Sequence, residues 1–205
     1  MIRPEPHSAN AAVEASRFWK AKDAGPGKFF SVGNRLQFDA ELPPAAFPFP
    51  HATEDRLVLQ QPNAKILDQH TVAEIAQIVQ PSVSPTLLHA FGGQLVRANS
   101  GKAYVPADTA TSSLGAIEVL PGAIHLYEDN LPGNKRRLRA VLQHAGLGYD
   151  LSVTADAAKE RFLANGLPAL VAEIQQAARL HVRVGLARAF NDAPCYAQVN
   201  GLYFL

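Results

Sequence analysis

Proline interrupts the first half of this chain so often that long helices are excluded there. Ten of the 15 prolines precede residue 103 in a chain of 205 residues, and each removes a backbone N–H and fixes φ. The segment LPPAAFPFPH, residues 42–51, therefore predicts an extended connection. Most other segments are short, β-prone and bounded by turn residues, without the strand–helix alternation of a parallel sheet. We expect a mostly β protein with barrel-like antiparallel halves and short helices.

The clearest strand signal lies in the second half. Tyr149, Leu151 and Val153 alternate with polar residues, which is the period of a half-buried antiparallel strand. Ala145-Gly146 suits a tight turn, so we predict a hairpin that joins residues 137–143 to this strand.

The other predicted strands are shorter. Gly33-Asn34 predicts a turn between strands 29–32 and 35–38, because both turn residues tolerate positive φ. The remaining predicted strands cover residues 56–60, 94–98, 102–105, 114–120, 124–127, 181–186 and 195–205.

The strongest helix signal begins at Thr71. Thr71 and Glu74 form a capping box, and Pro81 ends the helix that follows. Ser84 predicts the start of a second helix, with Gly92 at its end. Further helices are predicted for residues 9–22 and for residues 156–179, the latter interrupted at Asn165-Gly166.

These elements suggest two parts. We expect an N-terminal α+β part, residues 1–110, that contains the helical hairpin 71–92, and a C-terminal β unit, residues 111–205, with the helical insert 156–179. Both lengths are compatible with small domains.

Composition restricts the functional classes. The single cysteine, Cys195, excludes an internal disulfide and a cysteine-based zinc site. No apolar run approaches the ~18 residues of a membrane span, so we expect a cytoplasmic protein without a membrane partner. The net charge is only +1, but residues 131–205 carry 9 Lys and Arg against 5 Asp and Glu. An anionic partner is therefore expected at the C-terminal part.

Three C-terminal segments form a family pattern: LGAIEV from residue 114, KRRLRAVLQHAGLGYDLSVTAD from residue 135, and HVRVGLARAFNDAPCYAQVNGLYF from residue 181. They resemble the bacterial dual OB-containing domain family, in which an arginine-bearing hairpin ends in G-x-Y-x-L-x-V-T-D. The matching residues are Leu114, Gly115, Ile117, Val119, Arg137, Arg139, Gly148, Tyr149, Leu151, Val153, Thr154, Val184, Leu186, Phe190, Cys195 and Tyr196.

The chain also departs from the family pattern. Ala155 separates Thr154 from Asp156, and Ala197 stands where a lysine is common. The opening Ile2-Arg3-Pro4 implies a truncated first barrel. The resemblance implies two OB-like barrels, the first degenerate or truncated, and a role linked to nucleic acid or to bacterial defence. It implies no catalytic residues and no cofactor.

Small OB-type barrels bind single strands through a basic groove and aromatic faces. Arg137, Arg139 and Arg183 are the expected phosphate contacts, with Tyr149 as a stacking face. The alternative is that these arginines form the solvated face of a sheet and that Tyr149 lies in the core. The full set of candidate nucleic-acid contacts is Lys135, Arg136, Arg137, Arg139, Tyr149, His181 and Arg183.

The sequence gives little support for a metal site or a catalytic site. His70 and Glu74 share a helix face, but without further ligands we expect capping or exposure and no metal site. The group His51, Glu54 and Asp55 is expected to form a turn or a surface ion pair. No nucleophile elbow, SxxK motif or phosphate loop is present. We expect a non-enzymatic binding module that contacts single-stranded nucleic acid. A subunit of a larger protein complex and an unrecognised enzyme are the alternatives.

Overall fold

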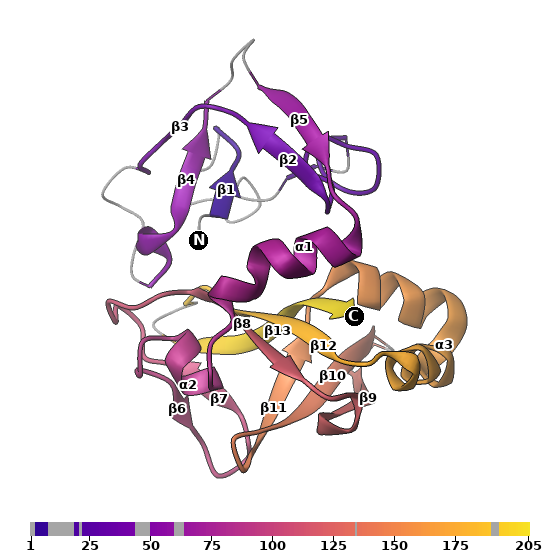
Figure 1. The fold of residues 1–205 in the computed structure, drawn as a ribbon. Coiled ribbons are helices and arrows are strands. Elements are labelled where there is room, and N and C mark those ends of the chain that lie inside the picture. The colour runs from indigo at the N-terminus through magenta and orange to yellow at the C-terminus, as the bar shows by residue number, and fades with distance from the viewer. Residues whose placement is uncertain are drawn as a thin grey trace. The chain divides into compact units, whose positions relative to one another are not determined.

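The computed structural model describes residues 3–7, 19–20, 22–43, 50–59, 64–133, 135–189 and 193–205 (Figure 1). The chain forms two compact units, residues 1–78 and 79–205. The expected division after residue 110 lies further along the chain than this boundary. Residues 79–110 instead contribute strands that pair within the second unit. Most of the predicted helix 9–22 lies outside the described residues.

The first unit contains two small sheets. In one, β4 pairs in parallel with β1 and antiparallel with β3; in the other, β2 pairs antiparallel with β5. The strands are β1 Arg3–Glu5, β2 Asn34–Gln37, β3 Ala40–Glu41, β4 Asp55–Val58 and β5 Lys65–Gln69, with the 3-10 turn η2 His51–Thr53 before β4.

The expected hairpin around Gly33-Asn34 is wrong, because residues 29–32 form no strand. The side-chain amide of Asn34 donates to the carbonyl oxygens of Lys28 and Phe29, at 2.9 and 3.0 Å. These bonds close a local turn, and β2 pairs with β5 instead. The partner of β2 is therefore set by a long-range contact that no local pattern shows.

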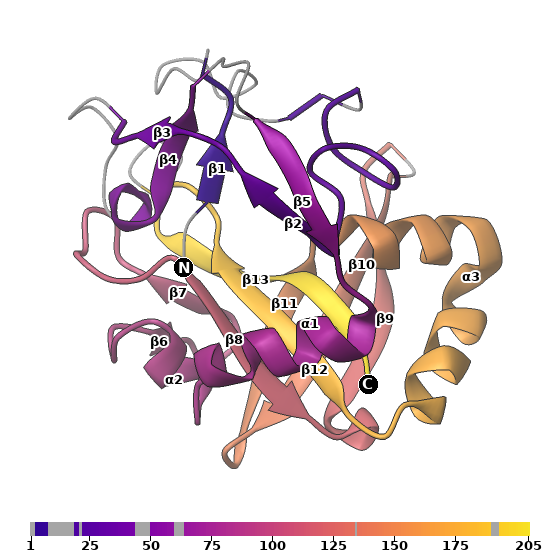
Figure 2. The ribbon, with the colours of Figure 1, turned by 45° about the horizontal axis from the view of Figure 1, so that its top comes forward.

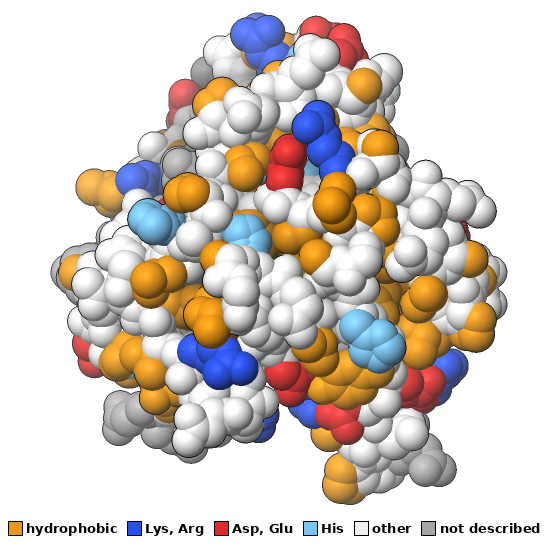
Figure 3. Space-filling view, turned by 60° about the horizontal axis from the view of Figure 1, so that its bottom comes forward, with side chains coloured by type: hydrophobic (Ala, Val, Ile, Leu, Met, Phe, Trp, Pro, Cys, Tyr) orange, Lys and Arg blue, Asp and Glu red, His pale blue; other side chains and the backbone are white. Residues whose placement is uncertain are grey.

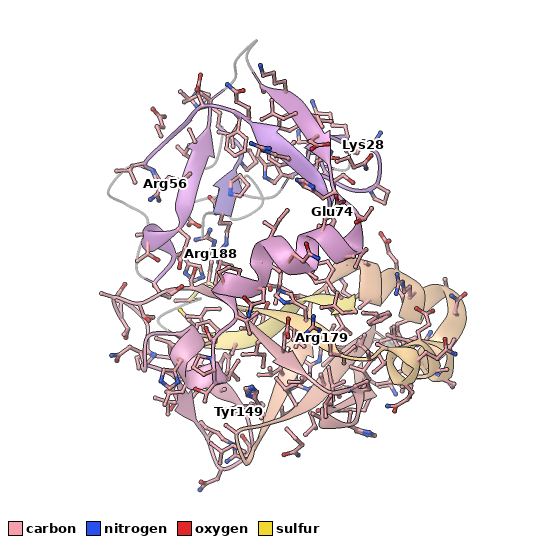
Figure 4. All side chains as sticks on the ribbon, viewed as in Figure 1. Lys28, Arg56, Glu74, Tyr149, Arg179 and Arg188 are labelled. Carbon is pink, nitrogen blue, oxygen red and sulfur yellow. The ribbon has the colours of Figure 1, made fainter. Side chains whose placement is uncertain are left out.

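The capping box is confirmed. The Thr71 N–H donates to Glu74 Oε2 at 2.7 Å, and the Glu74 N–H donates to Thr71 Oγ1 at 3.3 Å, at the start of α1 Val72–Val79 (Figure 4). The backbone hydrogen bond from Thr71 lowers the pKa of Glu74. Pro81 lies in the 3-10 turn η3 Gln80–Ser82 directly after the helix.

The second predicted helix starts later than expected. It covers only α2 Leu87–Ala90, and Thr86 caps it by accepting the His89 N–H at 3.1 Å. Ser84 is not the cap, because Thr86 holds that position; the Ser84 N–H instead donates to the carbonyl of Ala116 at 2.7 Å. In place of the expected helical hairpin, α1 is followed by the 3-10 turn η3 and the four-residue helix α2.

The second unit is a curled sheet with an OB-like path. β9, β10 and β11 form an antiparallel meander, β11 pairs in parallel with β13, and β12 joins β13 to β8 (Figure 2). Only the short turn η4 Pro121–Ala123 separates β8 from β9, so the path returns to its start. The strands are β6 Val96–Arg97, β7 Ala103–Val105, β8 Leu114–Val119, β9 Ile124–Leu131, β10 Lys135–His144, β11 Leu147–Val153, β12 Leu180–Leu186 and β13 Cys195–Phe204.

Counting β8 and β9 as one interrupted strand, the second unit has the five strands of an OB barrel. The predicted hairpin between β10 and β11 is confirmed, with Ala145 at φ 49° and Gly146 at φ 78°. Both residues have the positive φ of a type I′ turn. The β6–β7 hairpin extends the sheet through the pairing of β7 with β13.

The core of the second unit lies inside the curled sheet. Leu138, Ala140 and Leu142 of β10 face it at 2% exposure or less. Tyr149, Leu151 and Val153 of β11 are buried as their alternation predicts. Phe162, Leu170 and Ile174 add a helical face to the same core.

The helical insert α3, Asp156–Gln176, is interrupted at Gly166, as predicted from Asn165-Gly166. Gly166 has φ 80° and ψ 168°, a region that only glycine adopts without strain. Among the described residues, no helix has both the length and the apolar character needed to cross a membrane.

Replacing Gly166 with alanine should lower the free energy of unfolding by about 1–3 kcal/mol, because a Cβ at this φ and ψ is strained. Urea denaturation measures the change. Gly122→Ala is the matched control, because Gly122 has no positive φ and no atom within 4 Å of an added Cβ. Equal effects of the two substitutions would contradict the strain argument.

Candidate functional site

The outer face of the β9–β10–β11 meander carries polar side chains. Because successive strand residues point to opposite faces, Arg137 and Arg139 lie opposite the core residues of β10. Across the ladder they pair with Asp129 and Tyr127 of β9, and Arg139 also pairs with Ser152 of β11. The strand pairing thus brings cations, carboxylates and hydroxyls onto one face.

Arg139 is held inside this face and is only 6% exposed. Its Nη2 lies 2.8 Å from Asp150 Oδ2, its Nε donates to Tyr127 Oη at 2.8 Å, and its Nη1 donates to Ser152 Oγ at 3.1 Å. Burial lowers the pKa of Arg139, but the bonds to Asp150 and Tyr127 outweigh it and the net shift is upward. This network holds Arg139 in place, and the residue lacks the exposed position that was expected for a phosphate contact.

Arg136 lies near the start of β10 and is partly exposed. It donates to both carboxylate oxygens of Glu128, at 2.7 and 3.0 Å, and these bonds lower the pKa of Glu128. Its Cζ lies 4.5 Å from the ring centroid of Phe162, a cation–π contact.

Arg137 pairs with Asp129 through Nη2, and this bond lowers the pKa of the carboxyl. Its side chain is 38% exposed. The Nε of Arg137 is buried, and no hydrogen-bond partner for it exists among the residues that the structure describes. Arg137 is therefore only partly satisfied by its ion pair.

Three other candidates are placed differently from the expectation. Tyr149 is 4% exposed within the core, so it offers no stacking face and the alternative reading of this residue is confirmed (Figure 4). His181 is 2% exposed, and burial lowers its pKa. Both are ruled out as surface contacts. Arg183 is half-buried on β12, and Lys135 begins β10, its side chain being outside the described residues.

A pocket opens where β10 and β11 diverge. Their pairing ends at Arg139 and Ser152, and from there β11 pairs with β13. The cavity has a volume of about 290 Å³. We call it the fork pocket; it is lined by Arg136, Arg137, Leu138, Ser152, Val153, Thr154, Lys159, Phe162, Leu163 and Gln198.

Tyr104 and Tyr196 form an aromatic pair that the sequence did not point to. Tyr196 and Gln198 lie two residues apart on the outward face of β13, and Gln198 is the register partner of Ser152. Tyr196 is 43% exposed, and its ring centroid lies 5.8 Å from that of Tyr104 on β7. The alternation along residues 195–200 could have placed Tyr196 outward.

Basic residues do not form one large patch on the face shown in Figure 3. The Lys and Arg side chains drawn in colour there are separated by hydrophobic and uncharged surface. Within the second unit, the described arginines of β10 each have a carboxylate partner. An anion site on β10 would therefore depend on local donors rather than on a broad positive field.

The remaining candidate residues from the sequence, His51, Glu54, Asp55 and Cys195, have buried side chains. The expected turn is found, since His51 begins the 3-10 turn η2, but His51, Glu54 and Asp55 are buried rather than at the surface, and Asp55 pairs with Arg3 at 3.1 Å. In the described part of the chain, no three His, Cys, Asp or Glu residues are placed to hold a metal ion. Burial raises the pKa of the Cys195 thiol, which disfavours the reactive thiolate.

The comparisons with known proteins agree with this architecture. The family model of the dual OB-containing domain matches residues 38–202, which is most of the chain. Curated proteins and solved structures gave no match. The interrupted five-strand path of the second unit and the extent of the family match lead to one conclusion: the chain belongs to the dual OB-containing domain family.

Proposed function

We propose that this chain is a binding module that contacts single-stranded nucleic acid through its C-terminal barrel, without catalysing a reaction. OB barrels are generally binding modules, and oligonucleotides bind on the face of the second and third strands. Here those strands are β10 and β11, and the fork pocket lies at their diverging ends. A bacterial defence or nucleic-acid-processing context is part of this proposal.

The observation that carries the proposal is the line of side chains from Tyr196 to Arg137. Tyr196 offers an exposed ring, Gln198 and Ser152 follow across the parallel strand pair, and Arg137 and Lys159 supply positive charge at the pocket. Two strand residues span about 7 Å, close to the reach of one nucleotide. A strand that stacks a base on Tyr196 and places a phosphate at the pocket would use both the aromatic and the cationic side chains.

We expect a fluorescently labelled dT oligonucleotide to bind in low salt and to weaken as salt rises, because bound phosphates release counterions. Tyr196→Ala should cost about 1–3 kcal/mol of binding free energy through lost stacking. Arg137→Ala should reduce the log–log salt slope by about 0.7, the value for one phosphate contact on a single strand. Fluorescence anisotropy at several salt concentrations measures both effects.

Arg179→Ala is the matched control, because Arg179 is a 55% exposed cation that pairs with Glu118 away from the pocket lining (Figure 4). It should leave the affinity and the salt slope unchanged. Absence of binding at low salt, or equal effects of the Arg137 and Arg179 substitutions, would contradict the proposal.

A second candidate function is that of a subunit in a larger protein complex. All five residues of β5 are exposed, including Ile66 at 50% and Leu67 at 45%. Among the described strands β5 pairs only with β2, and an open edge strand with apolar side chains can pair with another chain. The C-terminal residues, by contrast, pair with β12 and pack partly against the core of the chain itself. A stable stoichiometric partner in the purified protein would favour this function.

A further inference from the structure

The fork pocket gathers hydrogen-bond donors from separate elements. Arg136 and Arg137 come from β10, and Lys159 comes from the first turn of α3. The described lining residues include these three cations and no carboxylate. All three cations have acidic partners outside the lining. Glu128 and Asp129 on β9 hold the two guanidinium groups, and Asp156 Oδ1 lies 2.9 Å from Lys159 Nζ.

Arg137 provides the most specific feature of the pocket. Asp129 engages its Nη2, while the buried Nε–H has no partner among the described residues. Buried polar groups are nearly always hydrogen-bonded, so an unsatisfied one in a native fold indicates a missing partner. An Arg presents its donors as a planar fork that matches the oxygens of a carboxylate or phosphate.

Two neighbouring polar side chains keep donors that their recorded hydrogen bonds do not use. Ser152 Oγ accepts from Arg139 Nη1 at 3.1 Å, which leaves its own hydroxyl hydrogen for another acceptor. Thr154 Oγ1 donates to Gln198 Oε1 at 3.3 Å. This bond uses the oxygen of the Gln198 amide, so the amide nitrogen remains available as a donor. An oxyanion in the pocket would therefore meet donors from β10, β11 and β13.

The size of the cavity limits the ligand. About 290 Å³ is at the small end of ligand pockets, which commonly measure ~300–1,000 Å³. It accommodates a phosphate with its attached sugar, and the exposed side chain of Leu163 supplies apolar wall for the sugar. A compact pocket suits the end of a strand better than an internal phosphate, which must let the chain continue on both sides.

We infer that the fork pocket binds a phosphate monoester, supplied by the phosphorylated end of a nucleic-acid strand. The identity of the strand rests on the proposed function, whereas the monoester site rests on the pocket itself. The monoester carries up to two negative charges and three terminal oxygens. The exposed edge of the Arg137 guanidinium and the Lys159 ammonium can share them, because Asp156 engages only one of the three ammonium donors.

The test compares three dT oligonucleotides of equal length: one with a 5′-phosphate, one with a 3′-phosphate and one with neither. We expect about tenfold tighter binding for a phosphorylated end, equivalent to ~1.4 kcal/mol. Arg137→Lys keeps the charge but removes the planar fork, so it should abolish the end preference and keep general binding. Arg179→Ala should keep both the end preference and the general binding.

An NMR titration with adenosine monophosphate and with inorganic phosphate tests the pocket without an oligonucleotide. The Nε–H signal of Arg137, assigned by its loss in Arg137→Lys, should shift saturably. If this signal shifts but no oligonucleotide binds, the monoester site stands and the nucleic-acid function falls. If oligonucleotides bind without an end preference and the signal does not shift, the monoester site is overturned and the function stands. No binding in either experiment would overturn both.

Discussion

Replacing Arg139 with alanine should destabilise the second unit by about 3 kcal/mol. The substitution leaves Asp150 without its ion-pair partner on a face where Arg139 itself is 6% exposed. Breaking a buried ion pair commonly costs ~3–5 kcal/mol, and the lower end applies because the Asp150 side chain keeps 22% exposure. Chemical denaturation followed by circular dichroism gives the free energy of unfolding.

A double-mutant cycle with Asp150→Ala separates the pair from its surroundings. The double variant should lose less stability than the two single variants together, with a coupling of about 0.5–3 kcal/mol. Arg161→Ala is the control, because Arg161 and Glu173 form an exposed pair at 46% and 39% exposure. That pair should contribute at most about 1 kcal/mol. Additive losses in the cycle would show that the Arg139–Asp150 contact is not energetically coupled.

The position of Arg139 also affects the choice of binding variants. A protein that carries Arg139→Ala loses stability whether or not it binds nucleic acid. Reduced binding by an Arg137→Ala/Arg139→Ala variant could therefore come from a lost phosphate contact or from lost stability. Arg137 is the better single target, because its side chain is 38% exposed and it lines the fork pocket. Its substitution tests the pocket while the buried network of Arg139 stays intact.

Phe162→Ala should lower the free energy of unfolding by about 3–5 kcal/mol. Phe162 is 1% exposed in the core, where α3 packs on the curled sheet, and removal of a buried aromatic ring loses burial and leaves a cavity. The substitution also removes the ring beneath the Arg136 guanidinium. Thermal and urea denaturation should both show the loss.

The adjacent residue is the control. Leu163 lies beside Phe162 on α3 but is 61% exposed, so Leu163→Ala should change stability by no more than about 0.5 kcal/mol. Phe162→Leu should be intermediate, because it fills part of the cavity. A similar loss for Phe162→Ala and Leu163→Ala would mean that α3 does not pack on the sheet as described.

Local patterns in the sequence were enough to predict several elements of the fold. The alternation of Tyr149, Leu151 and Val153 correctly predicts their common face, because a strand has a side-chain period of two. The capping box at Thr71 and the interruption at Gly166 are likewise confirmed. Each of these features depends on residues close together in the chain, where stereochemistry limits the conformations.

The sequence by itself determined the alternating faces of β10 and β11, the turn at Ala145-Gly146 and the helix start at Thr71, whereas the tertiary structure decided which faces meet. The alternation places Arg137 and Arg139 on one face of β10, but the pairing with β9 and β11 gives them their carboxylate partners and buries Arg139. The parallel pairing of β11 with β13 brings Gln198 beside Ser152 and so forms the wall of the fork pocket. The physical reason is that a strand's period identifies its two faces, while hydrogen bonding to distant segments selects the neighbours of each face.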